Sequence, residues 1–133
     1  PPLIVIHLGT ATTLMVLDQN GAMIGGSICP GIRISMEALT QRAALLPGLQ
    51  LDAPKRTIGR NTVECMRSGI MVGAAAMLDG MVARMEEELG AKATVIATGR
   101  IGQYVVPLCK TPMRYERDLV LQGLAALYWE NAR

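Results

Sequence analysis

The sequence predicts an α/β fold in which a mixed β-sheet, with three antiparallel strands plus parallel strands, is packed by helices. Apolar runs separated by turn residues fill the first thirty positions, a pattern typical of consecutive strands. Pro30-Gly31 then breaks the sheet, and apolar residues recur at helical spacing from position 32 onward. One apolar pattern, over residues 62–89, is long enough for a helix of about 40 Å.

Turn residues divide the first part of the chain into strands expected at residues 3–8, 14–17 and 22–28. The first strand is apolar throughout except for His7, which indicates a buried strand. Residues 9–13 are expected to form a tight turn. Asn20-Gly21 has the composition of a hairpin turn between the second and third strands.

Four helices and two further strands are expected in the remainder: helices at 32–46, 62–89, 101–108 and 119–131, and strands at 93–97 and 113–115. Asn61 precedes the long helix and Glu64 follows three residues later, as in a capping box. Gly90 is a suitable C-cap for the same helix.

This order of elements fits one lobe of the ribonuclease-H-like architecture found in the superfamily of actin-like ATPases, sugar kinases and Hsp70. A nuclease of that architecture needs several carboxylates to hold two metal ions. The first strand contains none, so the nuclease interpretation is disfavoured.

The composition fits one compact domain over residues 1–133 and excludes several classes of protein. Half of the residues are hydrophobic and 18% are charged, so the chain can bury a core and is not intrinsically disordered. Its 13 Lys+Arg against 11 Asp+Glu leave a net charge of +2, which argues against a dedicated nucleic-acid binder. The most apolar stretch, 70–78, is too short to span a bilayer. No basic segment precedes the first apolar run, so we expect no secretory signal and a cytoplasmic protein without membrane contact.

The three cysteines, Cys29, Cys65 and Cys109, do not have the spacing of metal ligands. We expect them to be small buried apolar residues in a reducing compartment. His7 is the single histidine, which excludes a zinc site built on several histidines.

The segment Gly9-Thr10-Ala11-Thr12-Thr13 is the clearest chemical motif. A turn with glycine and three threonines can direct backbone N–H groups and hydroxyls at one point. Such a concavity suits phosphate oxygens, because several fixed donors face a concentrated negative charge. The alternative is a Thr-rich hairpin that forms through β-propensity alone.

Small residues at three other element ends could also contact a ligand. Gly31 stands where a strand meets a helix start, and helix N-termini favour anions. Gly99 follows a buried strand, where a missing side chain lets a ligand approach the backbone. Thr62 stands at the start of the long helix beside Arg60. Ordinary turn geometry and helix capping are the alternatives.

Taken together, these stretches resemble type III pantothenate kinase, the bacterial enzyme that phosphorylates pantothenate in coenzyme A synthesis. Their order and spacing cover essentially the whole chain. The matching residues are Leu8-Gly9-Thr10-Ala11-Thr12-Thr13, Gly25-Gly26, Pro30-Gly31-Ile32, Ala38-Leu39, Arg42-Ala43, Leu46-Pro47, Ile58-Gly59, Asn61-Thr62, Ser68-Gly69-Ile70, Ile96-Ala97-Thr98-Gly99, Asp118-Leu119 and Gly123-Leu124.

The resemblance implies that the chain is the C-terminal lobe of such a kinase. The family's N-terminal lobe carries an Asp-Gly-Asn-Thr phosphate loop and a Gly-x-Asp-Arg motif with the catalytic aspartate, and neither motif occurs in these 133 residues. The chain is therefore expected to supply no catalytic residue. Pantothenate is expected to contact Thr62 beside the partner of a homodimer. ATP is expected to contact Gly9, Thr10, Thr12, Thr13 and Gly99.

Two residues depart from the family pattern. His7 stands where the family usually has an aspartate that binds a monovalent cation, potassium or ammonium, and imidazole is a poor ligand for such an ion. A protonated His7 could instead supply the cation's charge near the phosphates. Arg100 replaces the family's second glycine, where its side chain would either block the nucleotide base or pair with a phosphate. Both departures fit the alternative function, a catalytically inactive scaffold or regulatory accessory factor.

Overall fold

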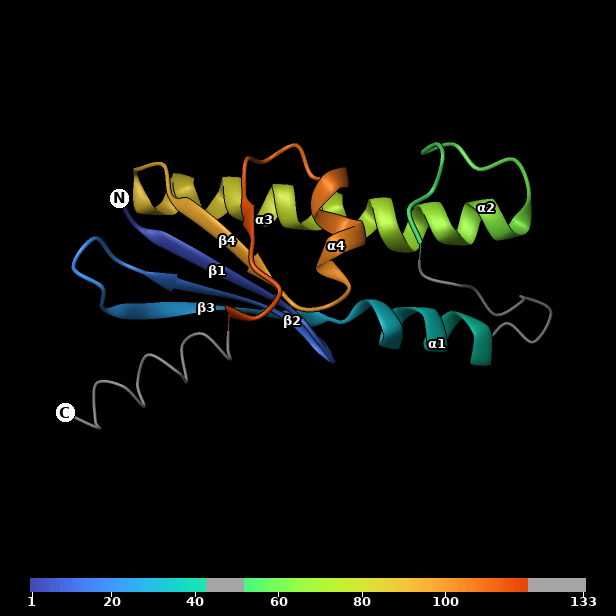
Figure 1. Cartoon of the computed structure of the whole chain (residues 1–133), viewed down its shortest axis with the longest axis horizontal. Helices are drawn as coiled ribbons and strands as arrows, with labels where there is room; N and C mark the ends of the chain where they lie inside the picture. The colour runs from blue at the N-terminus through green and yellow to red at the C-terminus, as the bar shows by residue number, and fades with distance from the viewer. Residues whose placement is uncertain (43–51, 120–133) are drawn as a thin grey trace.

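The chain forms a mixed five-stranded sheet with a long helix across one face (Figure 1). The structure is a computed structural model, and it describes residues 1–42 and 52–119. The order of the strands in the sheet is β3-β2-β1-β4-β5. Neighbours among β1, β2 and β3 are antiparallel, whereas β4 is parallel to β1 and β5 is parallel to β4. The strands are β1 (Leu3–Leu8), β2 (Ala11–Leu17), β3 (Met23–Pro30), β4 (Thr94–Thr98) and β5 (Arg114–Tyr115). The predicted mixed sheet is confirmed.

The first turn is shorter than predicted. β2 begins at Ala11, so that the turn consists of Gly9 and Thr10 alone. Thr12 and Thr13 are paired with β1 instead, because β-branched side chains favour a pleated strand. The prediction that the turn extends to position 13 is therefore wrong.

The helix predicted for residues 62–89 consists of three consecutive segments. These are α2 (Thr62–Arg67), a π-helical turn η1 (Ser68–Val72) and α3 (Gly73–Leu89). The Asn61 side chain accepts a hydrogen bond from the Glu64 N–H at 2.9 Å, as the predicted cap requires. The Glu64 carboxylate in turn accepts one from the N–H of Arg60, the residue before the N-cap, at 2.8 Å. Gly90 ends α3 with a φ of 69°, so its predicted role as C-cap is confirmed.

The remaining helices agree with the predicted order. α1 (Ile32–Arg42) begins where it was predicted, and its predicted last turn lies outside the described residues. α4 (Gly102–Val105) and the 3₁₀ turn η2 (Val106–Leu108) together occupy the third predicted helical stretch, 101–108. The helix predicted for 119–131 lies outside the described residues beyond Leu119.

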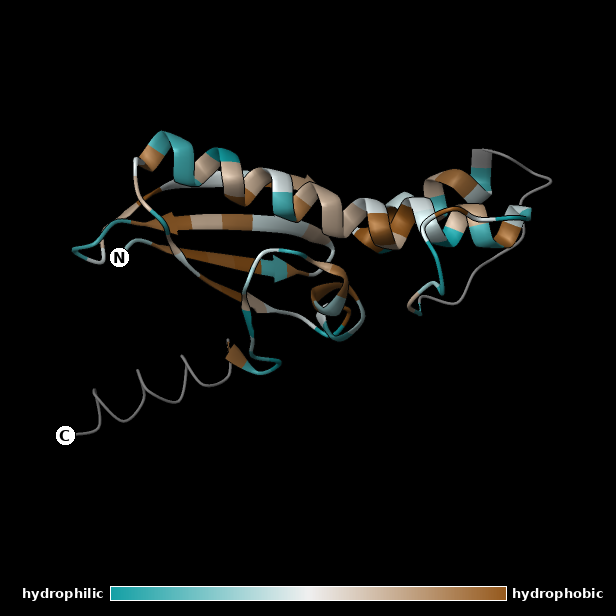
Figure 2. Cartoon of the chain, turned by 90° about the horizontal axis from the view of Figure 1, so that it is seen from above, coloured by the Kyte–Doolittle hydropathy of each residue, from teal (hydrophilic) through white to brown (hydrophobic). Residues whose placement is uncertain are grey.

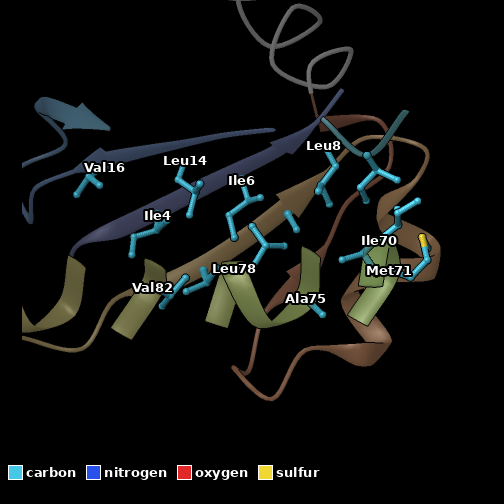
Figure 3. Close-up of a cluster of buried hydrophobic side chains, with 14 residues drawn as sticks. Ile4, Ile6, Leu8, Leu14, Val16, Ile70, Met71, Ala75, Leu78 and Val82 are labelled. Atoms are coloured by element: carbon cyan, nitrogen blue, oxygen red, sulfur yellow. The ribbon is translucent and has the colours of Figure 1, made fainter. Parts of the chain in front are cut away.

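The core lies between one face of the sheet and the long helix (Figure 3). Every second residue of β1 and β2 is buried on this face, because successive strand side chains point to opposite sides. α3 supplies the other wall with residues three or four positions apart, as its helical period requires. The side chains that meet are Ile4, Ile6, Leu8, Leu14, Val16, Met71, Ala75, Leu78 and Val82. Each buried Ile or Leu contributes about 1.5–3 kcal/mol, so this contact fixes the long helix to the strands.

The helical stretch Thr62–Leu89 is longer than residues 70–78, the most apolar segment of the sequence. With 28 residues and a mean hydropathy of 1.2 in its most apolar window, it could cross a bilayer by length and composition alone. A core helix has the same properties, and here Leu78 and Val82 are fully buried beneath the sheet. Figure 2 shows polar residues alternating with apolar ones along this helix. We therefore attribute its apolar character to packing.

The cysteines do not all behave as predicted. Cys65 is exposed, because α2 extends beyond the end of the sheet (Figure 1). Cys29 and Cys109 are half-buried. Burial and the nearby charge of Asp79 raise the pKa of the Cys109 thiol to about 12, which keeps this thiol protonated and unreactive at neutral pH.

Asp79 on α3 holds the segment that leads into β5. Its carboxylate accepts hydrogen bonds from the backbone N–H groups of Lys110 and Thr111, both at 2.9 Å. Burial raises the pKa of the Asp79 carboxyl, but these hydrogen bonds and the charge of Lys110 outweigh it, so the net pKa lies below the usual 3.8. The carboxylate therefore stabilises the folded state in its ionised form.

Replacing Asp79 by Asn should lower the free energy of unfolding at neutral pH. Because the pKa is lower in the folded than in the unfolded state, the carboxylate's contribution is present above the unfolded value and is lost as the pH falls through the folded value. Urea denaturation should show the difference between wild type and Asp79→Asn shrinking toward zero at acid pH. The control Glu87→Gln, which removes an exposed carboxyl from the same helix, should give no such trend. A difference that stays constant from neutral to acid pH would contradict this assignment.

Candidate functional site

Three glycines allow close contacts at the carboxyl ends of β1 and β4, two with the backbone of another segment and one with the His7 ring. A Cβ added to Gly99, whose φ is 107°, would overlap the Leu8 carbonyl oxygen. A Cβ added to Gly31, the residue before α1, would overlap the Thr10 carbonyl oxygen. One added to Gly9 would lie 2.7 Å from Cε1 of His7. We call Gly9, Gly31 and Gly99 the glycine junction, since none of the three could carry a side chain without displacing its neighbour.

The turn between β1 and β2 is open to solvent. The Gly9 N–H donates to the Ala11 carbonyl oxygen at 3.2 Å, which closes the hairpin. Thr10 is at the tip and is exposed. Within residues 1–42 and 52–119, its own N–H makes no hydrogen bond. This amide and the Thr10 hydroxyl are therefore available to a ligand.

The N-terminus of α1 lies against this turn, because Gly31 contacts the Thr10 carbonyl. The first N–H groups of a helix have no partner within it and carry a partial positive charge. No acidic residue occupies the first turn of α1. The arrangement places positive potential beside the exposed Thr10 amide, which suits an anionic group.

The three threonine hydroxyls do not converge on one point. Neighbouring strand residues face opposite sides of the sheet, so Thr12 and Thr13 diverge. Thr12 is 1% exposed and lines an apolar groove of about 810 Å³ between α1 and the long helix. Thr13 is half-buried and is paired with His7 on the other face. The prediction that the three hydroxyls meet at one site is therefore wrong, and Thr10 alone is at the tip.

Thr62 lies apart from the glycine junction. It is the first residue of α2, the part of the long helix that extends beyond the sheet (Figure 1), and its side chain is exposed. The described residues do not bring Thr62 together with Gly9, Thr10 or Gly99. Arg100, next to Gly99, is also exposed.

Tyr115 is a positioning residue that the sequence did not reveal. Its hydroxyl donates to the Gly99 carbonyl oxygen at 2.6 Å. A Cβ on Gly102 would lie 2.6 Å from the Tyr115 ring, so the ring packs directly on the start of α4. This pair of contacts holds the Gly99 turn, and only the pairing of β5 with β4 brings Tyr115 there.

The residues around His7 do not fit the monovalent cation that the family resemblance implies. β1, β2, β3 and β4 contain no Asp or Glu, and the first acidic residue of α1 is Glu37. Among the described residues no group of three or more His, Cys, Asp or Glu could hold a metal ion. Potassium prefers oxygen ligands, whereas imidazole suits transition metals. The chemistry proposed for this chain therefore does not use such a cation.

Substituting Gly99 by Ala should destabilise the fold, because the new Cβ would meet the Leu8 carbonyl at a φ that L residues rarely adopt. Strain of this kind costs about 1–3 kcal/mol. The control is Gly80→Ala on α3, where a Cβ would meet nothing within 4 Å. Alanine should stabilise that helix by about 0.5–1 kcal/mol. Urea denaturation of both variants tests this, and equal effects would contradict the close approach of β1 and β4.

Comparison with known proteins identifies the family. The family model described as type III pantothenate kinase matches residues 1–84. A type III pantothenate kinase of Thermomicrobium roseum is 48% identical over 127 residues, which are 96% of this chain and 49% of that protein. One of Moorella thermoacetica is 43% identical over 130 residues, 98% of this chain and 51% of that protein. The chain thus spans about half the length of the curated relatives it matches.

A solved structure of a Baf family protein from Campylobacter jejuni shares the fold. Its TM-score is 0.69 at 19% sequence identity, and the match covers 97% of this chain and 58% of that one. Because sequence identity this low shows the fold alone, the family assignment depends on the sequence matches. On that evidence the chain belongs to the type III pantothenate kinase family.

Proposed function

We propose that the chain is the C-terminal lobe of an ATP-dependent kinase that converts pantothenate to 4′-phosphopantothenate, the first step of coenzyme A synthesis. The observation that carries the proposal is the glycine junction, which exposes the Thr10 amide beside the N-terminus of α1. Its relatives carry the name of this kinase. The family assignment supports pantothenate as the substrate, and the geometry of the junction supports it as the place where the nucleotide would bind.

The strand order supports an actin-like, ribonuclease-H-like lobe. Three antiparallel strands followed by two parallel ones, in the order β3-β2-β1-β4-β5, are what that architecture requires. In open α/β sheets ligands bind at the carboxyl ends of the parallel strands. The glycine junction lies at those ends of β1 and β4, so we place the nucleotide there.

The proposed role of this lobe is to hold the phosphates of ATP. The Thr10 amide and hydroxyl would donate to phosphate oxygens, with Gly9 and Gly99 allowing the nucleotide to approach the backbone. Arg100 is exposed next to Gly99 and would pair with a phosphate. Thr13 lies in the same hairpin as Thr10. Thr12 is buried and would support this hairpin by packing.

Phosphoryl transfer requires little covalent chemistry from the protein. The transferred group carries its negative charge on three equatorial oxygens in the transition state, and fixed donors stabilise that charge. The pantothenate hydroxyl attacks the γ-phosphorus, the bond to the β-phosphate oxygen breaks, and ADP leaves. The hydroxyl proton would pass to an aspartate that lies outside these residues, in the N-terminal lobe.

The other parts of the proposal come from the family resemblance. Pantothenate would contact Thr62 at the interface of a homodimer, which agrees with the exposure of Thr62 at the start of α2. The N-terminal lobe of the same protein would complete the cleft. The enzyme would act in the cytoplasm.

To test the proposal, the intact protein is assayed for formation of ADP and 4′-phosphopantothenate. Intact here includes any part that lies outside these 133 residues. We expect product from the intact protein and none from the 133-residue chain alone, because the base is missing from it. Product from the chain alone would contradict an external base. An intact protein that dimerises but binds neither ATP nor pantothenate would contradict the kinase assignment and favour a scaffold or accessory factor.

A further inference from the structure

We propose that this lobe holds the phosphates of its nucleotide without a bound monovalent cation, and that the His7 imidazole contacts a phosphate oxygen directly through a ring N–H. The inference rests on the proposed function, because it concerns the same nucleotide site. Three properties of the described residues support it: the position of His7, its unused nitrogens and the lack of Asp or Glu on strands β1 to β4.

His7 is the last outward-facing residue of β1. Ile6 and Leu8 are buried toward the long helix, and His7 between them is exposed on the opposite face. It is paired with Thr13 on β2 and with Thr98 on β4. It therefore lies at the carboxyl ends of the two parallel strands, where the proposed nucleotide site begins.

The imidazole presents its nitrogen-bearing edge to the Gly9–Thr10 turn. The position of a Cβ on Gly9 would be 2.7 Å from Cε1, 3.2 Å from Nδ1 and 3.5 Å from Nε2 of His7. Because the atom between the two nitrogens is the nearest, the N–C–N edge of the ring faces Gly9. A side chain at Gly9 would require the ring to move. One residue further on is the exposed Thr10 amide.

Neither ring nitrogen is used elsewhere in the part of the chain that the structure describes, since no hydrogen bond or salt bridge involves the His7 side chain there. By contrast, the neighbouring Thr98 hydroxyl donates to the Arg117 carbonyl at 3.2 Å. A neutral imidazole has one N–H to donate and a protonated one has two. His7 is therefore a free donor beside the turn.

The charges near the junction do not favour a cation. The strands that meet there carry no Asp or Glu, and the residues flanking Gly99 and Gly31 include Arg100 and Arg33. Two carboxylates follow β5: Glu116 is paired with Arg114 at 2.6 Å, and Asp118 is exposed beside Arg117. Hard cations are bound through oxygen atoms, and the His7 side chain offers none. Here the charge that balances the phosphates would come from the protein itself.

The test measures ATP affinity of the intact protein by calorimetry, in potassium salt and in tetramethylammonium salt. Wild type should bind ATP within about twofold in the two salts. His7→Asp should bind about tenfold or more weakly without potassium and should regain affinity with it, since a carboxylate then attracts the cation. His7→Gln keeps an N–H donor and should lose less affinity than His7→Ala, whose loss should be about tenfold.

A matched control separates the site from a general effect of charge. Thr94 is exposed at the opposite end of β4, paired with Leu3 rather than His7. Thr94→Asp places a carboxylate on the same sheet but far from the junction, and should show no potassium dependence. Thermal unfolding of every variant checks that the fold is retained.

A second readout does not depend on catalysis. In protein labelled with ¹⁵N-histidine, the imidazole nitrogens of His7, assigned by their loss in His7→Gln, should shift when a non-hydrolysable ATP analogue is added. Two results would overturn the inference and leave the kinase assignment intact. One is unchanged His7 signals at saturation with the analogue, and the other is a wild-type ATP affinity that falls by about tenfold or more when potassium is replaced. Absence of ATP binding in every salt would instead overturn the proposed function.

Discussion

The close approach of three backbone segments at Gly9, Gly31 and Gly99 is the constraint on which the site depends. A Cβ at Gly31 or Gly99 would overlap the carbonyl of Thr10 or Leu8. These contacts hold the end of β1, the end of β4 and the start of α1 together, with little between them except backbone. A fixed, unpaired amide such as that of Thr10 can stabilise a phosphate's charge without first reorganising, and side chains at Gly31 or Gly99 would separate the segments.

The hydrophobic core between the sheet and the long helix supports the glycine junction. Every second side chain of β1, and every third or fourth side chain of α3, is apolar and buried. The two apolar faces meet at Ile6 and Leu78. From α3, Asp79 reaches across to the backbone of Lys110 and Thr111, and the chain then returns to the sheet at Tyr115. The Tyr115 hydroxyl bonds to the Gly99 carbonyl, so the long helix and the edge strand both support the same turn.

The sequence predicts the order of the elements well because apolar periodicity and caps such as Asn61 and Gly90 are local properties. It predicts their ends less well: Thr12 and Thr13 were assigned to a turn, but pairing with β1 draws them into a strand. Cys65 was expected to be buried, yet α2 extends past the sheet and leaves it exposed. The roles of Gly31 and Tyr115 depend on contacts between distant segments, which no local pattern contains.

The central claim is that the Gly9–Thr10 turn faces the phosphates of a nucleotide, and a charge placed there tests it most directly. Thr10→Asp puts a carboxylate at the exposed tip, and Asn20→Asp puts one at the exposed turn at the other end of β2. Calorimetry on the intact protein should show ATP affinity reduced by about tenfold or more for Thr10→Asp and unchanged for Asn20→Asp. Equal ATP affinities for the two variants would contradict the claim.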